Sequence, residues 1–231
     1  KAVFMAGGPG SGKGFVAKNI LGGTGLRVVN SDDMFEYLMK KQDLALEPDV
    51  ISTPQGQETR RRAKSLIKTR EAQYIDGRIG LIIDGTGKQP ELIQRHVDKL
   101  KEFGYDSAMI MVNTSLPVAQ QRNQERERTV PSELVSQLWN EVQQNLMKYQ
   151  QIFGADRFHI IDNSGGLEDL DRQKNFDKVY NETQRFLNTP PKNRQALKWI
   201  QQQKEQNDEK RSAQPTQQQN QQPDGGTAKT D

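Results

Sequence analysis

The chain has 231 residues, with 33 Lys and Arg against 30 Asp and Glu, a net charge of +3 and no cysteine. The lack of cysteine excludes disulfides and cysteine-ligated zinc sites. The mildly basic charge permits a nucleotide or nucleic-acid partner, and no apolar run approaches the ~18 residues of a membrane span. We therefore expect a soluble, cytoplasmic protein with no membrane partner.

A glycine-rich loop follows the first apolar run, residues 2–6. Residues 7–13 match G-x-x-x-x-G-K between a predicted strand and helix, the context in which this pattern binds phosphates. Glycines let successive N–H groups point at one anion, and Lys13 would reach the outer phosphates. The alternative is a plain turn. The next position, usually Ser or Thr for Mg²⁺, is Gly14. The predicted ATP site comprises Gly8, Pro9, Gly10, Ser11, Gly12, Lys13 and Gly14.

Strands and helices alternate over the next 150 residues. Apolar runs predict strands at residues 2–6, 26–30, 79–84, 107–112 and 157–161. Apolar residues at three- and four-residue steps predict helices at residues 14–21, 34–41, 58–75, 90–103, from 117, and 132–153, with a long loop at 42–57. This order predicts an α/β protein with a three-layer P-loop NTPase fold and a five-stranded parallel sheet.

The composition changes beyond residue 164. Residues 167–187 and the segment after Pro190-Pro191 are predicted helices, whereas ten of the 31 residues from Gln201 onward are glutamine. Such a polar segment buries too little apolar surface to offset its ordering entropy. We therefore divide the chain into a P-loop domain at residues 1–164, a helical extension at 165–200 and a disordered, glutamine-rich tail at 201–231. This C-terminal arm is a candidate binding site for a protein partner.

Carboxylates follow two of the predicted strands. Asp32 and Asp33 come after the second strand and Asp84 ends the third, and ligands bind outside the carboxyl ends of parallel strands. Because phosphoryl transfer to a hydroxyl needs a carboxylate that takes the proton, Asp32 is the candidate general base. Its alternative role is to cap the helix that follows. Asp84 and Asp32 are candidate Mg²⁺ ligands, and Asp33 and Thr86 are candidate acceptor contacts.

Arginines form two groups. Arg122 and Arg126 are four residues apart, so both project from one helical face and suit a triphosphate. Arg60 begins a run of three arginines beside the long loop and could hold an acceptor phosphate. The alternative for both groups is a solvated, ion-paired helix surface.

The order of these motifs resembles that of phage-type polynucleotide 5′-kinases over residues 2–164. The segments that carry the resemblance are residues 7–13, Ser31-Asp32-Asp33, Ala63-Lys64-Ser65, Asp84-Gly85-Thr86, Arg122-Asn123 with Arg126, and Val130-Pro131. The chain is also similar, more loosely, to zeta-toxin kinases built on the same P-loop plan. The resemblance implies Asp32 as the general base, Lys13 as the phosphate-binding lysine and Arg126 as the lid arginine that bridges nucleotide phosphates.

The chain departs from the polynucleotide kinases at Phe35, where they carry an arginine that helps to hold the acceptor phosphate. We consider two replacements: a guanidinium from Arg60, or stacking of an acceptor base on Phe35. Gly14 has a precedent in nucleoside monophosphate kinases, whose loops the sequence also resembles.

We therefore expect a kinase that uses ATP and Mg²⁺ to phosphorylate a hydroxyl, with a polynucleotide 5′ end or a nucleotide-like molecule as acceptor. One alternative is a zeta-toxin-like kinase of a nucleotide sugar. The other is a catalytically inactive ATP-binding protein that acts through partner binding.

Overall fold

The computed structural model describes residues 1–125, 128–166 and 168–212. Five strands form one sheet in the order β2-β3-β1-β4-β5, and every neighbouring pair is parallel. The strands are β1 (Ala2–Ala6), β2 (Arg27–Val29), β3 (Leu81–Asp84), β4 (Ser107–Asn113) and β5 (Phe158–Asp162). The predicted α/β fold with a five-stranded parallel sheet is confirmed.

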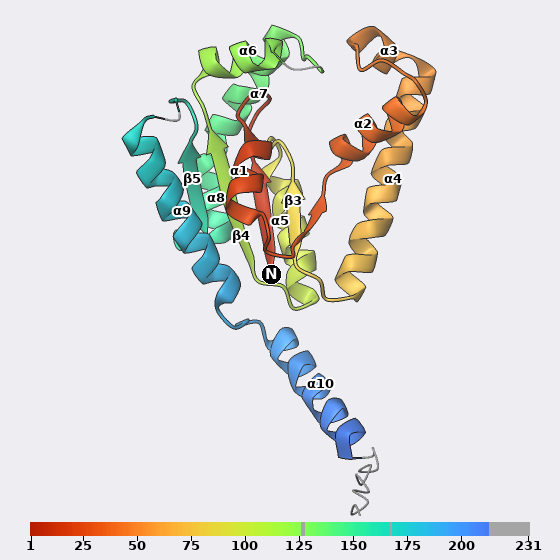
Figure 1. Cartoon of the computed structure of the whole chain (residues 1–231), viewed down its shortest axis with the longest axis vertical. Helices are drawn as coiled ribbons and strands as arrows, with labels where there is room; N and C mark the ends of the chain where they lie inside the picture. Colours follow the sequence, from red (N-terminus) through yellow and green to blue (C-terminus); the bar gives the residue numbers. More distant parts are fainter. Residues whose placement is uncertain (126–127, 167, 213–231) are drawn as a thin grey trace, which may run out of the picture.

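Alternation along the strands divides the core between the two faces of the sheet. In β1, Val3 and Met5 pack on one face, whereas Phe4 packs on the other. The first face is covered by α1 (Lys13–Leu21) and α9 (Leu170–Asn188), and the second by α5 (Pro90–Glu102), α7 (Ser132–Gln144) and α8 (Leu146–Phe153). Figure 1 shows these two layers with the sheet between them.

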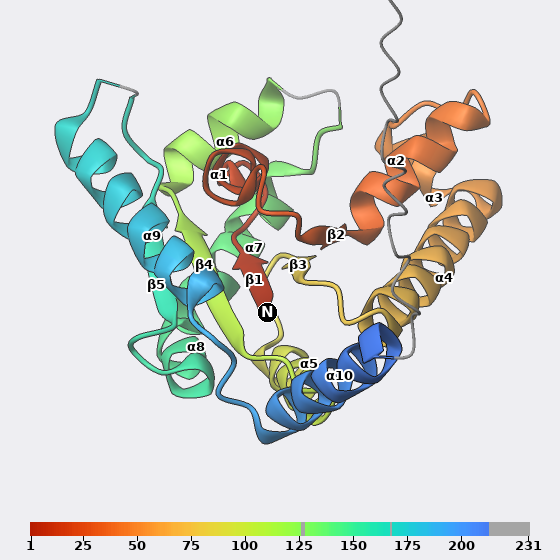
Figure 2. The same cartoon turned by 60° about the horizontal axis from the view of Figure 1, so that its bottom comes forward.

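Three helices form an arm beside the edge strand β2: α2 (Ser31–Lys41), α3 (Pro48–Ser52) and α4 (Pro54–Asp76). The arm lies on the β2 side of the sheet, whereas α9 lies on the opposite side (Figures 1 and 2). Buried Phe35 and Met39 of α2 join Ala63 of α4 in one apolar cluster, which holds the two helices together.

Two predicted element boundaries are wrong. The segment 42–57, predicted as a loop, contains α3 and the start of α4, because Pro48 and Pro54 each occupy a first helical turn and Thr53 caps α4 by accepting a bond from Gly56 N. The predicted helix 132–153 is two helices, α7 and α8. It breaks at Asn145, whose side chain donates to the carbonyl oxygen of Lys88 at 3.1 Å.

Two further helices, α6 and α10, complete the fold. Helix α6 (Leu116–Gln124) follows β4, and α10 (Arg194–Ser212) extends away from the domain in Figure 1. Residues 201–212, predicted to be disordered, belong to α10, because Gln, Lys and Glu have high helix propensity even where nothing is buried. The rest of the predicted tail lies outside the described residues.

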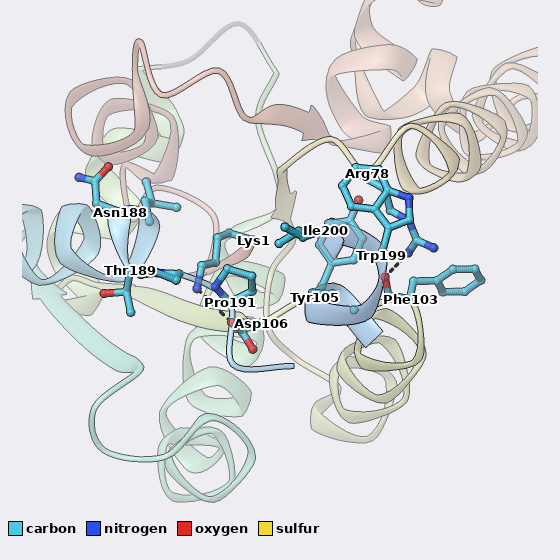
Figure 3. Close-up of a pocket in the computed structure, with 14 residues that line it drawn as sticks. Lys1, Arg78, Phe103, Tyr105, Asp106, Asn188, Thr189, Pro191, Trp199 and Ile200 are labelled. Carbon is cyan, nitrogen blue, oxygen red and sulfur yellow. Dashed lines mark hydrogen bonds and ion pairs between the residues drawn. The ribbon is translucent and has the colours of Figure 1, made fainter. Parts of the chain in front are cut away.

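The first turns of α10 are attached at the end of the sheet opposite the glycine loop. Asn193 donates to the carbonyl oxygen of Lys101 at 2.7 Å, and the Arg78 guanidinium lies 6.0 Å from the rings of both Phe103 and Trp199 (Figure 3). Nothing among the described helices is both long enough and apolar enough to cross a membrane.

Candidate active site

A cleft of about 400 Å³ lies at the carboxyl ends of β1, β2 and β3. It is lined by residues 8–14, Asn30, Asp32, Asp33, Glu36, Asp84, Gly85, Thr86, Arg122 and Arg128. The structure thus brings the predicted loop, the three carboxylates, Thr86 and Arg122 to one place. Another cavity, of about 350 Å³ beside Trp199 (Figure 3), contains none of these residues.

Two glycines of the loop adopt a left-handed backbone conformation. Gly10 and Gly12 have φ angles of 75° and 85°, in the left-handed region that other residues rarely adopt. A Cβ atom on Gly10 would come within 2.1 Å of the backbone oxygen of Ala119 in α6. The loop is therefore packed closely against α6, while residues 8–14 also line the cleft.

Lys13 and Gly14 begin α1. The Lys13 ammonium donates to the carbonyl oxygen of Gly7 at 2.7 Å, which folds its side chain over the loop. A Cβ atom on Gly14 would meet nothing within 4 Å, so the first atom of a side chain has room at this position.

Asn163, which the sequence analysis missed, holds the loop from behind. Its side-chain amide donates to the carbonyl oxygen of Ser11 at 2.8 Å, and its side-chain oxygen accepts two bonds from the buried Arg172. Its backbone oxygen accepts from Arg122 at 2.9 Å. The available signal was its place directly after β5, because the same argument about strand ends singled out Asp32 and Asp84.

A second missed residue, Asn30, organises the carboxylates. Its side-chain oxygen caps α2 by accepting bonds from the backbone N–H groups of Asp32 at 2.8 Å and Asp33 at 3.4 Å. Its amide donates to Oδ2 of Asp84 at 2.8 Å. The alternative in which Asp32 caps the helix is therefore wrong. The Asp32 side chain is 58% exposed and free of that role.

Burial and mutual repulsion change the acidity of two carboxylates. The pKa of Asp84 is raised by burial and, more weakly, by the charges of Asp33 and Asp32, while Lys13 opposes the rise. The pKa of Asp33 is raised by burial and by its neighbours Glu36 and Asp32, again against Lys13. Oδ1 of Asp84 is buried without a hydrogen-bond partner among the described residues. The site thus concentrates negative charge that a cation would relieve.

Arg128 reaches the cleft from the segment between α6 and α7. Its Nη1 atom lies 3.1 Å from Oε1 of Glu36 and 3.6 Å from Oδ1 of Asp32. Asn123 of α6 ties the end of this segment back to the helix: its side-chain amide donates to the backbone oxygen of Val130, and its side-chain oxygen accepts from the backbone N–H of Val130. Arg126, the arginine chosen from the sequence, lies outside the described residues.

Phe35 and Arg60 lie beside the cleft and are absent from its lining. The Phe35 ring is 1% exposed, with the guanidinium carbons of Arg60 and Arg128 at 4.6 and 5.5 Å from its centroid. A ring this buried offers no face to an acceptor base, so the predicted base stacking on Phe35 does not hold. Phe35 instead supports two arginines from different elements.

Three solved structures illustrate the fold similarity. The PezAT toxin–antitoxin system of Streptococcus pneumoniae matches with a TM-score of 0.53 and 15% identity, over 80% of this chain and 86% of that one. AvrRxo1-ORF1:-ORF2 with ATP gives 0.54 and 14%, over 78% and 63%. The Pnkp1/Rnl/Hen1 RNA repair complex gives 0.50 and 20%, over 64% and 45%. At these identities the likeness shows a shared fold and nothing about function.

Sequence comparison is consistent with this fold. No curated protein sequence matches the chain. The family model described as Zeta toxin matches residues 1–175, which include the loop, the arm, every lining residue of the cleft and Asn163. The chain therefore belongs to the zeta toxin family.

Proposed function

We propose that this protein is a kinase that transfers the γ-phosphate of ATP to a hydroxyl of an acceptor molecule. The observation that carries the proposal is the shared cleft, which is lined by the phosphate loop, Lys13 and the carboxylate of Asp32. The Asp32 side chain is exposed and does not cap α2. A nucleotide-binding protein without chemistry would need the loop alone.

The donor side of the cleft consists of the loop, Lys13 and Arg122. Backbone N–H groups of residues 10–14 would bind the phosphates, and Lys13 would move from the carbonyl oxygen of Gly7 to the outer phosphates. Arg122, fixed through Asn163, would contact the same phosphates. We assign Arg126 to the bridging of the phosphates, as the family resemblance implies, and Arg128 reaches the cleft from the same segment.

The acceptor side consists of Asp32, Asp33 and Thr86, with Arg60 and Phe35 behind them. Asp32 would take the proton of the acceptor hydroxyl while the hydroxyl oxygen forms a bond to the γ-phosphorus of ATP. The bond between the γ-phosphorus and the β–γ bridging oxygen breaks in the same step, which releases ADP. Asp33 and Thr86 line the same cleft and would contact the acceptor. Arg60, whose guanidinium lies over the Phe35 ring beside the cleft, is the candidate for holding an acceptor anion.

The carboxylates fit a bound Mg²⁺ ion. The unpartnered Oδ1 of Asp84 is the ligand type that Mg²⁺ prefers, and Asp32 would be the second protein ligand. No group of three or more His, Cys, Asp or Glu side chains that could hold a metal ion occurs among the described residues. Mg²⁺ commonly takes only one or two protein carboxylates and keeps several waters. The ion, when bound with ATP, neutralises charge on the phosphates.

Two acceptor classes remain in the proposal. A polynucleotide 5′ end or a nucleotide-like molecule is the acceptor that the motif order favours. A nucleotide sugar is favoured by the match of residues 1–175 to the zeta toxin family. The toxin–antitoxin system and the two-protein complex among the similar structures support a protein partner, for which we propose α10 as the binding element.

Transfer of radiolabel from ATP to a panel of acceptors tests this proposal. The panel contains 5′-hydroxyl oligonucleotides, nucleosides and nucleotide sugars. We expect label on one class, dependence on Mg²⁺, and loss of transfer with retained ATP binding in Asp32→Asn. Asp177→Asn, an exposed carboxylate of α9, is the matched control. ATP binding without transfer to any acceptor would instead support the inactive nucleotide-binding protein.

A further inference from the structure

A cavity of about 350 Å³ lies beneath the first turns of α10 (Figure 3). Residues that line it precede β1 and β4, which places it at the end of the sheet opposite the active cleft. Volumes of roughly 300–1,000 Å³ are typical of pockets that bind small molecules. Much of the wall is aromatic or aliphatic: Phe103, Tyr105, Leu187, Pro191, Trp199 and Ile200. We call it the α10 cavity.

The composition of α10 changes where the helix leaves this cavity. Its apolar residues, Ala196, Leu197, Trp199 and Ile200, all lie in the first turns, whereas residues 201–212 are all polar or charged. Ala196, Trp199 and Ile200 line the cavity. No residue of α10 in its described range is buried, and Trp199 is 38% exposed. A ligand in the cavity would therefore bury apolar surface of both the helix and the domain.

Arg78 lies at the rim of the α10 cavity in an unfavourable backbone conformation. Its φ of 56° is in the left-handed region, where glycine would be the less costly residue. The side chain uses this position to donate from Nη1 to the backbone oxygen of Phe103. Its guanidinium carbon also lies 6.0 Å from the ring centroids of both Phe103 and Trp199. Such strain is typical of positions where the side chain has a specific role.

The other two charged residues of the cavity neutralise each other. Nζ of Lys1 lies 3.0 Å from Oδ2 of Asp106, and the same oxygen accepts from the backbone N–H of Lys192 at 3.1 Å. Arg78, by contrast, has no carboxylate partner within the described part of the chain. An aromatic wall with one unpaired guanidinium at its rim is complementary to a planar ring that carries a single negative charge.

We propose that the α10 cavity binds a planar aromatic molecule with one carboxylate, its ring beside Trp199 and Ile200 and its carboxylate on the Arg78 guanidinium. Arginine suits this role because its fork of N–H donors matches the two oxygens of a carboxylate. The site is separate from the active cleft, and the inference does not depend on the proposed kinase function.

Two probes that share a ring and differ in charge provide the test: 1-naphthaleneacetate and its neutral amide. They are titrated into the full chain at about pH 7.5, where the carboxylate is ionised, and the indole N–H signals are followed by NMR. The chain has two tryptophans, so Trp199→Phe assigns the signals. We expect the Trp199 signal to shift with a Kd of about 1 mM or lower for the carboxylate, as for a ligand of roughly 14 heavy atoms, and at least about ten-fold higher for the amide.

Trp139 serves as an internal control for the active cleft. Its backbone lies 3.9 Å from where a Cβ atom on Gly8 would stand, and its indole donates to the backbone oxygen of Thr114. We expect the Trp139 signal to stay unchanged in both titrations. A shift of Trp139 in place of Trp199 would place the probe at the wrong end of the sheet and overturn the proposal.

Variants of Arg78 locate the charge preference. Arg78→Gln should bring the ratio of the two Kd values close to one. Arg78→Gly should do the same, and because the left-handed backbone suits glycine, this variant separates loss of the guanidinium from a folding defect. Arg95→Gln, at an exposed arginine of α5, should retain the wild-type ratio. A wild-type ratio near one, an unshifted Trp199 signal, or a ratio that both Arg78 variants keep would overturn the proposal.

Discussion

The phosphate loop offers a pair of glycine substitutions with opposite expected effects. Gly10 and Gly14 lie four residues apart, but an added methyl group at Gly10 would collide with the backbone of Ala119, whereas at Gly14 it would enter open space. Gly10 also has a left-handed φ of 75°. The alanine variants at these two positions therefore test whether the loop has the backbone shape described above.

For Gly10→Ala, the left-handed conformation costs about 1–2 kcal/mol and overpacking adds about 1–3 kcal/mol. At about 2–4 °C per kcal/mol for a chain of this size, Tm should fall by roughly 4–20 °C. For Gly14→Ala, the gain in helix propensity is up to about 1 kcal/mol, so Tm should rise by at most roughly 2–4 °C.

Differential scanning fluorimetry with and without ATP measures both effects. We expect Gly10→Ala to lose the stabilisation by ATP and Gly14→Ala to keep it, since ligand binding to the folded state raises Tm. Equal melting temperatures and equal ATP responses in the two variants would refute the loop geometry.

Two further predictions concern the residues around the loop. Asn163→Ala removes the amide that holds Ser11 and leaves the buried Arg172 without its side-chain acceptor, so it should cost about 1.5–3 kcal/mol by urea denaturation and weaken ATP binding by calorimetry. Unchanged stability would show that Asn163 does not hold the loop. Because the raised pKa of Asp84 disfavours its charged form, folding stability is lost as pH rises from the ordinary aspartate pKa toward the raised value. Asp84→Asn should therefore raise Tm at pH 7, reduce the dependence of stability on pH and abolish transfer. A lower Tm at pH 7 would contradict the conclusion that the charged Asp84 destabilises the folded state.

The sequence was most informative where one local pattern decides the structure. The glycine loop, the apolar strands and the amphipathic helices are recognisable from spacing alone, and they led to the correct sheet. They also predicted that the loop, Asp32 and Asp84 lie at one end of the sheet, where these residues line one cleft. The position of Asp32 outside β2 followed from the same reasoning.

The sequence was least informative where a role depends on tertiary contacts. Ser31-Asp32-Asp33 is a plausible capping sequence, but Asn30 takes the cap because its amide also binds Asp84, which is remote in the chain. Phe35 was a candidate for base stacking from the sequence, but in the structure Arg60 of α4 and Arg128 lie over its ring. No periodicity in α2 indicates which of its aromatic residues faces solvent.

The same limit applies to the support of the loop. Asn163 lies 152 residues from Ser11 in the sequence, and their hydrogen bond depends on the positions of both β1 and β5. Arg172 completes this arrangement from α9, within the segment that the sequence analysis assigned to an extension beyond the domain. The family match to residues 1–175 includes it.

The central claim is that Asp32 takes the proton of an acceptor hydroxyl in a cleft that binds ATP. The most direct measurement is single-turnover transfer of radiolabel from ATP to the preferred acceptor by wild-type protein and Asp32→Asn, with ATP affinity measured in parallel. We predict that the variant retains ATP binding and loses at least about 100-fold in transfer rate, the lower range for a general base. Transfer at the wild-type rate in Asp32→Asn would contradict the account.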